Sequence, residues 1–210
     1  MQRSVAEPDA MGGPMGGAGR SVLSGFCAAF VAVGLGRFAY TPLIPALVAA
    51  HWFAPAAAVY LAAANLAGYL AGALAARPLA RRIPATPLLR AMMVLASGSF
   101  AACALHADFA WFLLWRFVAG LAGGVLMVLA ASVVLPHVAP RRRGRASGAI
   151  FLGVGSGIAL SGTVLPLLLS AGLPATWLVL GALGAAATAL AWGGWPRRAP
   201  AAAMAGGPPR

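Results

Sequence analysis

The sequence predicts an all-α membrane protein built as a bundle of six transmembrane helices. Of its 210 residues, 61% are hydrophobic and only 9% are charged, which is too little charge to cover the surface of a soluble domain. Several apolar segments reach about 20 residues, the length that a helix needs to cross a bilayer. The net charge of +12 comes from arginines that lie mostly between these segments. We therefore expect the basic residues to set membrane topology, and we expect no nucleic-acid partner.

Charged and turn-forming residues divide the apolar sequence into six predicted helices. These cover residues 22–48, 52–76, 86–105, a segment between Asp108 and His137, and two segments within 146–196. Thr86-Pro87 is typical of an N-cap followed by proline at the first helical position. Gly172-Leu173-Pro174 breaks the last uncharged stretch, which is too long for one crossing. The expected organisation is a disordered tail at 1–21, a transmembrane domain at 22–195 and a second tail at 196–210.

The arginines predict which helix ends face the cytoplasm. Thirteen of the fifteen lie in the tails, in the connections after the second and fourth helices or, for Arg90, in the first turn of the third helix, and the other three connections contain none. By the positive-inside rule both termini are cytoplasmic, as an even number of helices requires. Five tryptophans lie at predicted helix ends, as in the interfacial belts of membrane proteins: Trp52, Trp111, Trp177, Trp192 and Trp195.

Two arginines lie inside predicted membrane helices, Arg37 and Arg116. An arginine at the centre of such a helix costs about 2.5–3.5 kcal/mol, and the three acidic residues of the chain all lie outside the helices. Three roles therefore remain open. The arginines meet an anionic solute in a wet cavity, pair with a second half supplied by another chain, or bind backbone carbonyls freed near Gly34, Gly36 and Pro42. For Arg116, snorkelling to the nearby outer interface is a further alternative.

Other polar side chains accompany Arg37. Tyr40 and Thr41 follow it by three and four positions, so we expect them on the same helical face. Asn65 and Tyr69 form a similar pair on the second helix, although interhelical hydrogen bonding is an alternative role for Asn65. A polar stripe on each of two helices is what a solute cavity needs. The candidate substrate-binding or cavity residues are Arg37, Tyr40, Thr41, Asn65, Tyr69 and Arg116.

Pairs of glycines four residues apart predict close packing between helices. The pairs are Gly68 and Gly72, Gly120 and Gly124, and Gly153 and Gly157.

The sequence offers few residues for catalysis or for binding a metal ion. His51, His106 and His137 lie at span ends, with no cluster of acids or cysteines around them. The sequence therefore predicts no enzyme, no cofactor and no metal site.

Several motifs resemble the amino-terminal six-helix half of a major facilitator superfamily transporter. Residues 114–120 resemble that family's fourth-helix motif, in which an arginine is followed four residues later by glycine. Residues 72–82 resemble its loop motif between helices two and three, but the usual aspartate is Ala76 and the usual second glycine is Leu79. The gating contacts attributed to that aspartate therefore lack their carboxylate here. In the first helix, residues 36–43, together with 65–69, resemble a bacterial subgroup of these transporters without an agreed substrate.

The resemblance implies two inverted three-helix repeats, which would relate Arg37-Phe38 to Arg116-Phe117. It implies secondary active transport of a small solute by alternating access, in the bacterial inner membrane, and the unpartnered Arg37 favours an anionic solute. Complete transporters of this family have twice as many helices. The chain is therefore expected to be a truncated product or a half-unit, with a homodimer or a second transporter half as partner. The alternative is a non-transporting membrane scaffold or an inactive fragment.

Overall fold

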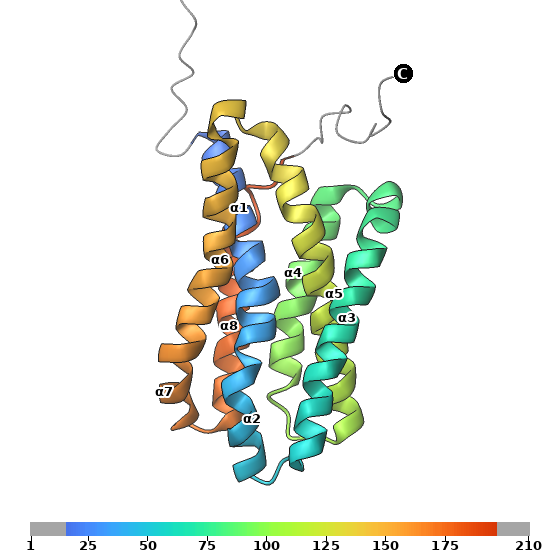
Figure 1. The fold of residues 1–210 in the computed structure, drawn as a ribbon, viewed down its shortest axis with the longest axis vertical. Helices are drawn as coiled ribbons and strands as arrows, with labels where there is room; N and C mark the ends of the chain where they lie inside the picture. The colour runs from blue at the N-terminus through green and yellow to red at the C-terminus, as the bar shows by residue number, and fades with distance from the viewer. Residues whose placement is uncertain (1–15, 197–210) are drawn as a thin grey trace, which may run out of the picture.

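The computed structural model describes residues 16–196, and within them it contains helices and no strand. Six helical segments are long and apolar enough to cross a membrane, which confirms the predicted six-helix membrane bundle (Figure 1). The elements in chain order are α1 (Gly17–Ala29), the π-helix η1 (Phe30–Phe38), α2 (Tyr40–Ala49), α3 (Pro55–Arg82), α4 (Ala85–Ala102), α5 (Phe109–Val134), the 3₁₀ turns η2 (Leu135–His137) and η3 (Pro140–Arg142), α6 (Arg143–Thr163), α7 (Leu165–Leu169) and α8 (Leu173–Ala191). Residues 1–15 and 197–210 of the predicted tails lie outside the described residues.

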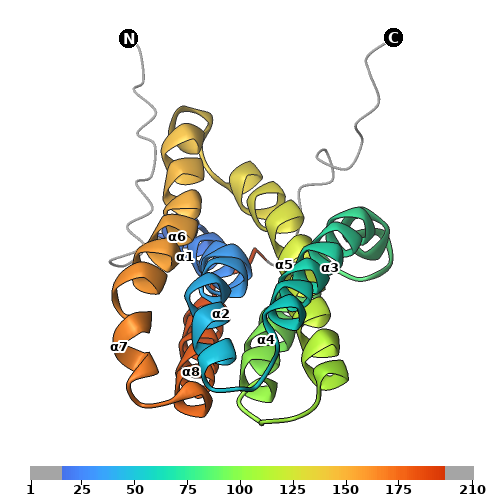
Figure 2. The same ribbon diagram turned by 60° about the horizontal axis from the view of Figure 1, so that its bottom comes forward.

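The first crossing, formed by α1, η1 and α2, lies in the middle of the bundle. Figure 2 shows it between α6, α7 and α8 on one side and α3, α4 and α5 on the other. It contacts α6 and α8 in the first group and α5 in the second, and α4 packs against α8 to join the two groups directly. The first crossing therefore links the two groups of helices.

The first crossing begins at Gly17, five residues before the predicted position, so part of the predicted first tail is helical. Two serines explain the earlier start. Ser21 Oγ donates a hydrogen bond to Gly194 O, and Ser24 Oγ donates one to Ala191 O, each at 2.9 Å. These bonds hold the first turns of α1 against the end of α8.

Local signals at other helix ends are partly confirmed. The Asp108 side chain accepts a hydrogen bond from the backbone N–H of Trp111 at 2.9 Å and caps α5. The predicted break before the last helix is also confirmed, because Gly172 has a φ of 93°, which favours glycine. The predicted cap at Thr86 is wrong, since α4 begins one residue earlier. Thr86 Oγ1 instead donates to Pro196 O at 2.7 Å.

Two helices continue into the arginine-rich connections, where the charge was expected to end them. α3 runs on to Arg82, and α6 already begins at Arg143. A long arginine side chain can keep its charged end in water while its stem follows the helix. A charge at the membrane surface therefore limits the apolar span without ending the helix.

Glycines allow α3 and α5 to approach at backbone distance. A Cβ added at Gly120 or Gly124 would overlap the carbonyl oxygen of Asn65 or Tyr69 on α3. The same closeness joins the first crossing to α6, where a Cβ on Gly34 would lie 2.8 Å from Gly157 Cα. The predicted packing role of the glycine pairs is therefore confirmed.

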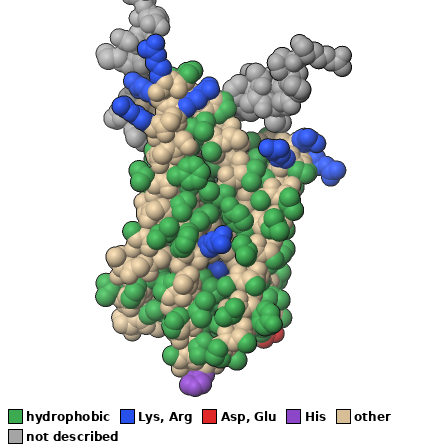
Figure 3. All heavy atoms as spheres, in the orientation of Figure 1, with side chains coloured by type: hydrophobic (Ala, Val, Ile, Leu, Met, Phe, Trp, Pro, Cys, Tyr) green, Lys and Arg blue, Asp and Glu red, His purple; other side chains and the backbone are tan. Residues whose placement is uncertain are grey.

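Charge is distributed unequally between the two ends of the bundle. Both ends of the described chain lie at one end (Figure 1), where Ser21 contacts Gly194. Figure 3 shows most basic side chains gathered there, and acidic and histidine side chains at the opposite end. This arrangement agrees with the separation of charge along the sequence. Which end faces the cytoplasm stays a prediction.

Not all tryptophans form interfacial belts. Trp177 has 1% of its surface exposed and Trp195 has 3%, so neither ring lies on the outer surface of the bundle, where an interfacial belt would place it. The Trp177 ring packs 6.3 Å from the rings of Tyr40 and Phe112. Trp177 therefore belongs to the bundle interior, next to the first crossing.

We expect Gly120→Ala to lower the free energy of unfolding by about 1–3 kcal/mol, because its methyl group would be forced into the backbone of α3. Gly148→Ala is the matched control, since no atom lies within 4 Å of a Cβ at that α6 glycine. Its effect should stay within about 0.5 kcal/mol. Thermal unfolding of the purified chain in detergent measures both, and equal destabilisation would contradict the close approach of α3 and α5.

Candidate functional site

Arg116 of α5 is buried inside the bundle, with 2% of its surface exposed. Its Nη2 donates a hydrogen bond to Gly36 O in η1 at 3.2 Å. Its guanidinium carbon also lies 4.1 Å from the centre of the Tyr40 ring in α2. Snorkelling to the interface is therefore wrong for Arg116. Its side chain turns inward and joins α5 to the first crossing.

These neutral partners offset the energetic penalty of burying the Arg116 cation. Inserting an arginine at the middle of a membrane helix costs about 2.5–3.5 kcal/mol. A hydrogen bond to a charged group contributes about 1.5–3 kcal/mol, and a desolvated cation–π contact contributes about 2 kcal/mol. The two contacts are thus large enough to hold the charge inside the bundle. Nε of Arg116 is buried and has no hydrogen-bond partner among the described residues.

The carbonyl that Arg116 binds belongs to an irregular part of the first crossing. In η1 the backbone hydrogen bonds join residues five apart, instead of four apart as in an α-helix, which makes the helix wider. Gly36 lies in this segment, and its carbonyl accepts from Arg116. Of the three alternative roles, Arg116 shows the contact with a backbone carbonyl of the first crossing.

Tyr40 and Asn65 are buried and make interhelical hydrogen bonds. Tyr40 Oη donates to Ala58 O of α3 at 2.9 Å, and Asn65 Nδ2 donates to Arg116 O at 3.0 Å. Asn65 thus shows the alternative role that its sequence position left open. With the guanidinium contacts, these bonds connect the first crossing, α3 and α5 into one polar network, defined by Gly36, Tyr40, Asn65 and Arg116.

Arg37 and Thr41, in contrast, are exposed, and Tyr69 is half-buried. The expectation that Tyr40 shares the face of Arg37 and Thr41 is wrong. Positions three and four residues after Arg37 lie on opposite sides of it, about 100° apart around the helix axis. The boundary of the bundle surface falls between them, so Tyr40 points inward while Arg37 and Thr41 point outward. Figure 3 shows basic side-chain atoms at mid-height on the bundle, away from the basic end.

The exposed and buried parts of the site are adjacent along the chain. Gly36, whose carbonyl accepts from Arg116, immediately precedes Arg37. Any movement of this part of η1 therefore moves the exposed guanidinium as well. Within residues 16–196 the one carboxylate is that of Asp108, which caps α5 at the far end of the bundle. Neither arginine is paired with a carboxylate in the part of the chain that the structure describes.

Sequence reasoning missed the role of Trp177 and the form of the first crossing. Gly34, Gly36 and Pro42 are sequence signals of an irregular helix, although they do not specify a π-helix. No comparable signal separates the buried Trp177 from Trp111, because both lie near the start of a helix, after a connection that contains no arginine. Among the described residues, no group of three or more His, Cys, Asp or Glu side chains could hold a metal ion.

The chain was compared with models of known protein families. The family model described as "Uncharacterised MFS-type transporter YbfB" matches residues 29–210. The matched range includes η1, the four residues of the polar network and the exposed Arg37. No curated protein matches the chain significantly.

We expect two substitutions at Tyr40 to destabilise the protein to different extents. Tyr40→Phe removes the hydrogen bond to Ala58 O but keeps the ring beside Arg116, and should cost about 0.6 kcal/mol. Tyr40→Leu also removes the cation–π contact and should cost roughly 2 kcal/mol more. Thermal unfolding in detergent compares the two variants. If they melt at the same temperature, the ring contributes nothing to the stability of buried Arg116.

Proposed function

Since the chain belongs to the YbfB family of MFS-type transporters, we propose that it takes part in the secondary active transport of a small anionic solute by alternating access. The chain is a multi-pass integral membrane protein with six membrane-length helices. In this proposal, its bundle is one half of the transporter and acts with a second six-helix unit, either a further part of the same polypeptide, a separate chain or a second copy. The bacterial inner membrane is the proposed location.

The exposure of Arg37 supports this proposal most directly. Arg37 lies twelve residues before the end of its crossing at Ala49, which is about 18 Å along the helix and near the middle of a hydrocarbon core of about 30 Å. A guanidinium facing acyl chains at that depth carries a penalty of several kcal/mol. We therefore infer that Arg37 faces a water-filled pathway between the two halves, where a solute can reach it.

An anionic solute fits the chemistry of this position. A guanidinium offers five N–H donors in a planar fork that matches a carboxylate or a phosphate. Thr41, also exposed, lies one turn further along the same side and adds a hydroxyl. In this proposal Arg37 and Thr41 contact the solute, and Tyr69 borders the pathway. The buried Arg116, Tyr40 and Asn65 are positioning residues that hold the first crossing in place.

The proposal predicts that Arg37→Gln reduces uptake of the transported anion about tenfold or more, the size expected for losing a hydrogen bond to a charged group. Arg37→Lys should retain intermediate activity, because it keeps the charge but loses the planar fork. Uptake of a panel of carboxylates into proteoliposomes that contain the full chain measures both. Arg145→Gln, at the exposed basic end, is the matched control and should transport within about twofold of the wild type.

Equal uptake by the wild type and Arg37→Gln would remove Arg37 from the solute pathway. A strictly monomeric chain that takes up no carboxylate and shows no ligand-induced thermal shift would instead support a non-transporting scaffold.

A further inference from the structure

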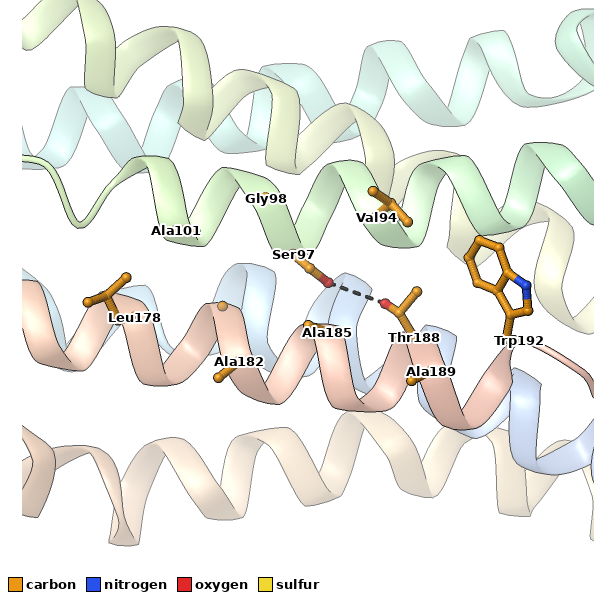
Figure 4. Close-up of a pocket in the computed structure, with 11 residues that line it drawn as sticks. Val94, Ser97, Gly98, Ala101, Leu178, Ala182, Ala185, Thr188, Ala189 and Trp192 are labelled. Atoms are coloured by element: carbon orange, nitrogen blue, oxygen red, sulfur yellow. Dashed lines mark hydrogen bonds between the residues drawn. The ribbon is translucent and has the colours of Figure 1, made fainter.

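A groove of about 840 Å³ lies between α4 and α8 on the surface of the bundle. Figure 4 shows Leu178 and Trp192 at its two ends along α8. These residues are fourteen positions apart, so the groove is about 21 Å long. Gly98 on α4 and Ala182 and Ala185 on α8 line it between these ends. Small side chains on both helices leave the space open.

The floor of the groove offers no free hydrogen-bond donor. Ser97 Oγ lies 2.8 Å from Met93 O, and Thr188 Oγ1 lies 2.7 Å from Gly184 O. Each hydroxyl has one hydrogen, and these carbonyls are closer than the 3.3 Å that separates the two hydroxyls (Figure 4). Each hydroxyl hydrogen therefore has an acceptor, either a carbonyl of its own helix or the other hydroxyl. The groove suits an apolar occupant.

A cation lies at one end of this apolar groove. Arg90 Nε and Nη2 donate to Trp192 O, and its guanidinium carbon lies 4.9 Å from the Trp192 ring centre. Arg90 also lines an adjoining hollow of about 470 Å³, which shares Val94 and Trp192 with the groove. Two of its five N–H groups are used by Trp192 O, so others remain for an anion. Arg90 lies near the start of α4, at the basic end of the bundle.

We propose that the groove binds a phospholipid with an anionic headgroup, with one acyl chain between α4 and α8 and the phosphate at Arg90. The groove lies on helices that cross the membrane, so hydrocarbon surrounds it. The hydrocarbon of one leaflet is roughly 15 Å thick, half of a core of about 30 Å. The groove is longer than this and can therefore hold most of an acyl chain. Arg90, at the end of the groove that lies toward the basic end of the bundle, supplies charge complementarity to a phosphate, which a helix of a second copy would not require.

The groove lies on a different face from Arg37. The first crossing lies behind α8 in Figure 4, whereas it lies in front of α8 in Figure 1. The basic atoms at mid-height in Figure 3 are on the side that faces the viewer of Figure 1. Lipid in the groove therefore leaves the proposed solute face uncovered, and the two proposals can fail separately.

The test titrates the purified full chain in detergent with phosphatidylglycerol or phosphatidylcholine of the same acyl composition and follows thermal stabilisation. Phosphatidylglycerol should bind about fivefold more tightly, as expected for one basic side chain at a lipid surface. Arg90→Gln should remove that preference, while Arg145→Gln keeps it.

Gly98→Leu should weaken the binding of both lipids. No atom lies within 4 Å of a Cβ at this position, so the leucine side chain fits there and fills the groove. Gly155→Leu, equally unobstructed on α6, should bind as the wild type does.

A phosphatidylglycerol preference that survives Arg90→Gln would overturn the proposal. Equal stabilisation by glycerol phosphate alone would indicate a site for a free anion instead. If Gly98→Leu converts a dimer to a monomer and leaves lipid binding unchanged, the groove is an interface between copies.

A second measurement uses phosphatidylglycerol with brominated acyl chains, which should quench Trp192 fluorescence. Trp192→Phe should lose that part of the quenching, and unchanged quenching would contradict an acyl chain in the groove.

Discussion

The burial of a guanidinium without a carboxylate constrains the centre of this bundle. Arg116 is held by one backbone carbonyl and one aromatic ring, both supplied by the first crossing. The carbonyl belongs to a π-helix, and that π-helix is fixed from the other side by the backbone contact between Gly34 and Gly157. Asn65 adds a third helix by binding the carbonyl of Arg116 itself. The position of the first crossing therefore depends on the buried cation, and the cation depends on the irregular backbone of that crossing.

The two membrane arginines have different environments although each precedes a phenylalanine in the sequence. Arg116 is enclosed and structural in its contacts, whereas Arg37 is exposed one residue after the carbonyl that Arg116 binds. Because the same short segment carries both features, a shift in the backbone of η1 would change the buried contact and the exposed charge together. We propose that this coupling serves an alternating-access movement that starts at the first crossing. Membership of a transporter family agrees with such a movement.

Hydropathy and turn signals were sufficient to predict the number of crossings and the break at Gly172, because these depend on local apolarity and backbone freedom. The glycine pairs were also readable, since close approach requires small side chains wherever it occurs. Which side of each helix faces inward was not readable. In a membrane helix, both lipid-facing and core-facing positions are apolar. The alternation of apolar and polar residues that marks the buried face of a soluble helix is therefore absent, and the sequence does not separate the buried Tyr40 from its exposed neighbours. The π-helix likewise depends on contacts with α5 and α6, which lie far away in the sequence.

We propose that Arg37 faces water within the membrane while Arg116 is enclosed, and thiol accessibility tests this difference most directly. The buried cysteines would first be replaced by Cys27→Ala and Cys103→Ala. Arg37→Cys, Arg116→Cys and the hydrocarbon-facing control Val94→Cys would then each be treated with a hydrophilic, membrane-impermeant thiol reagent in intact membranes. We expect rapid labelling at position 37 and little at positions 116 and 94. Labelling at position 37 as slow as at position 94 would contradict this proposal, because the guanidinium would then face acyl chains.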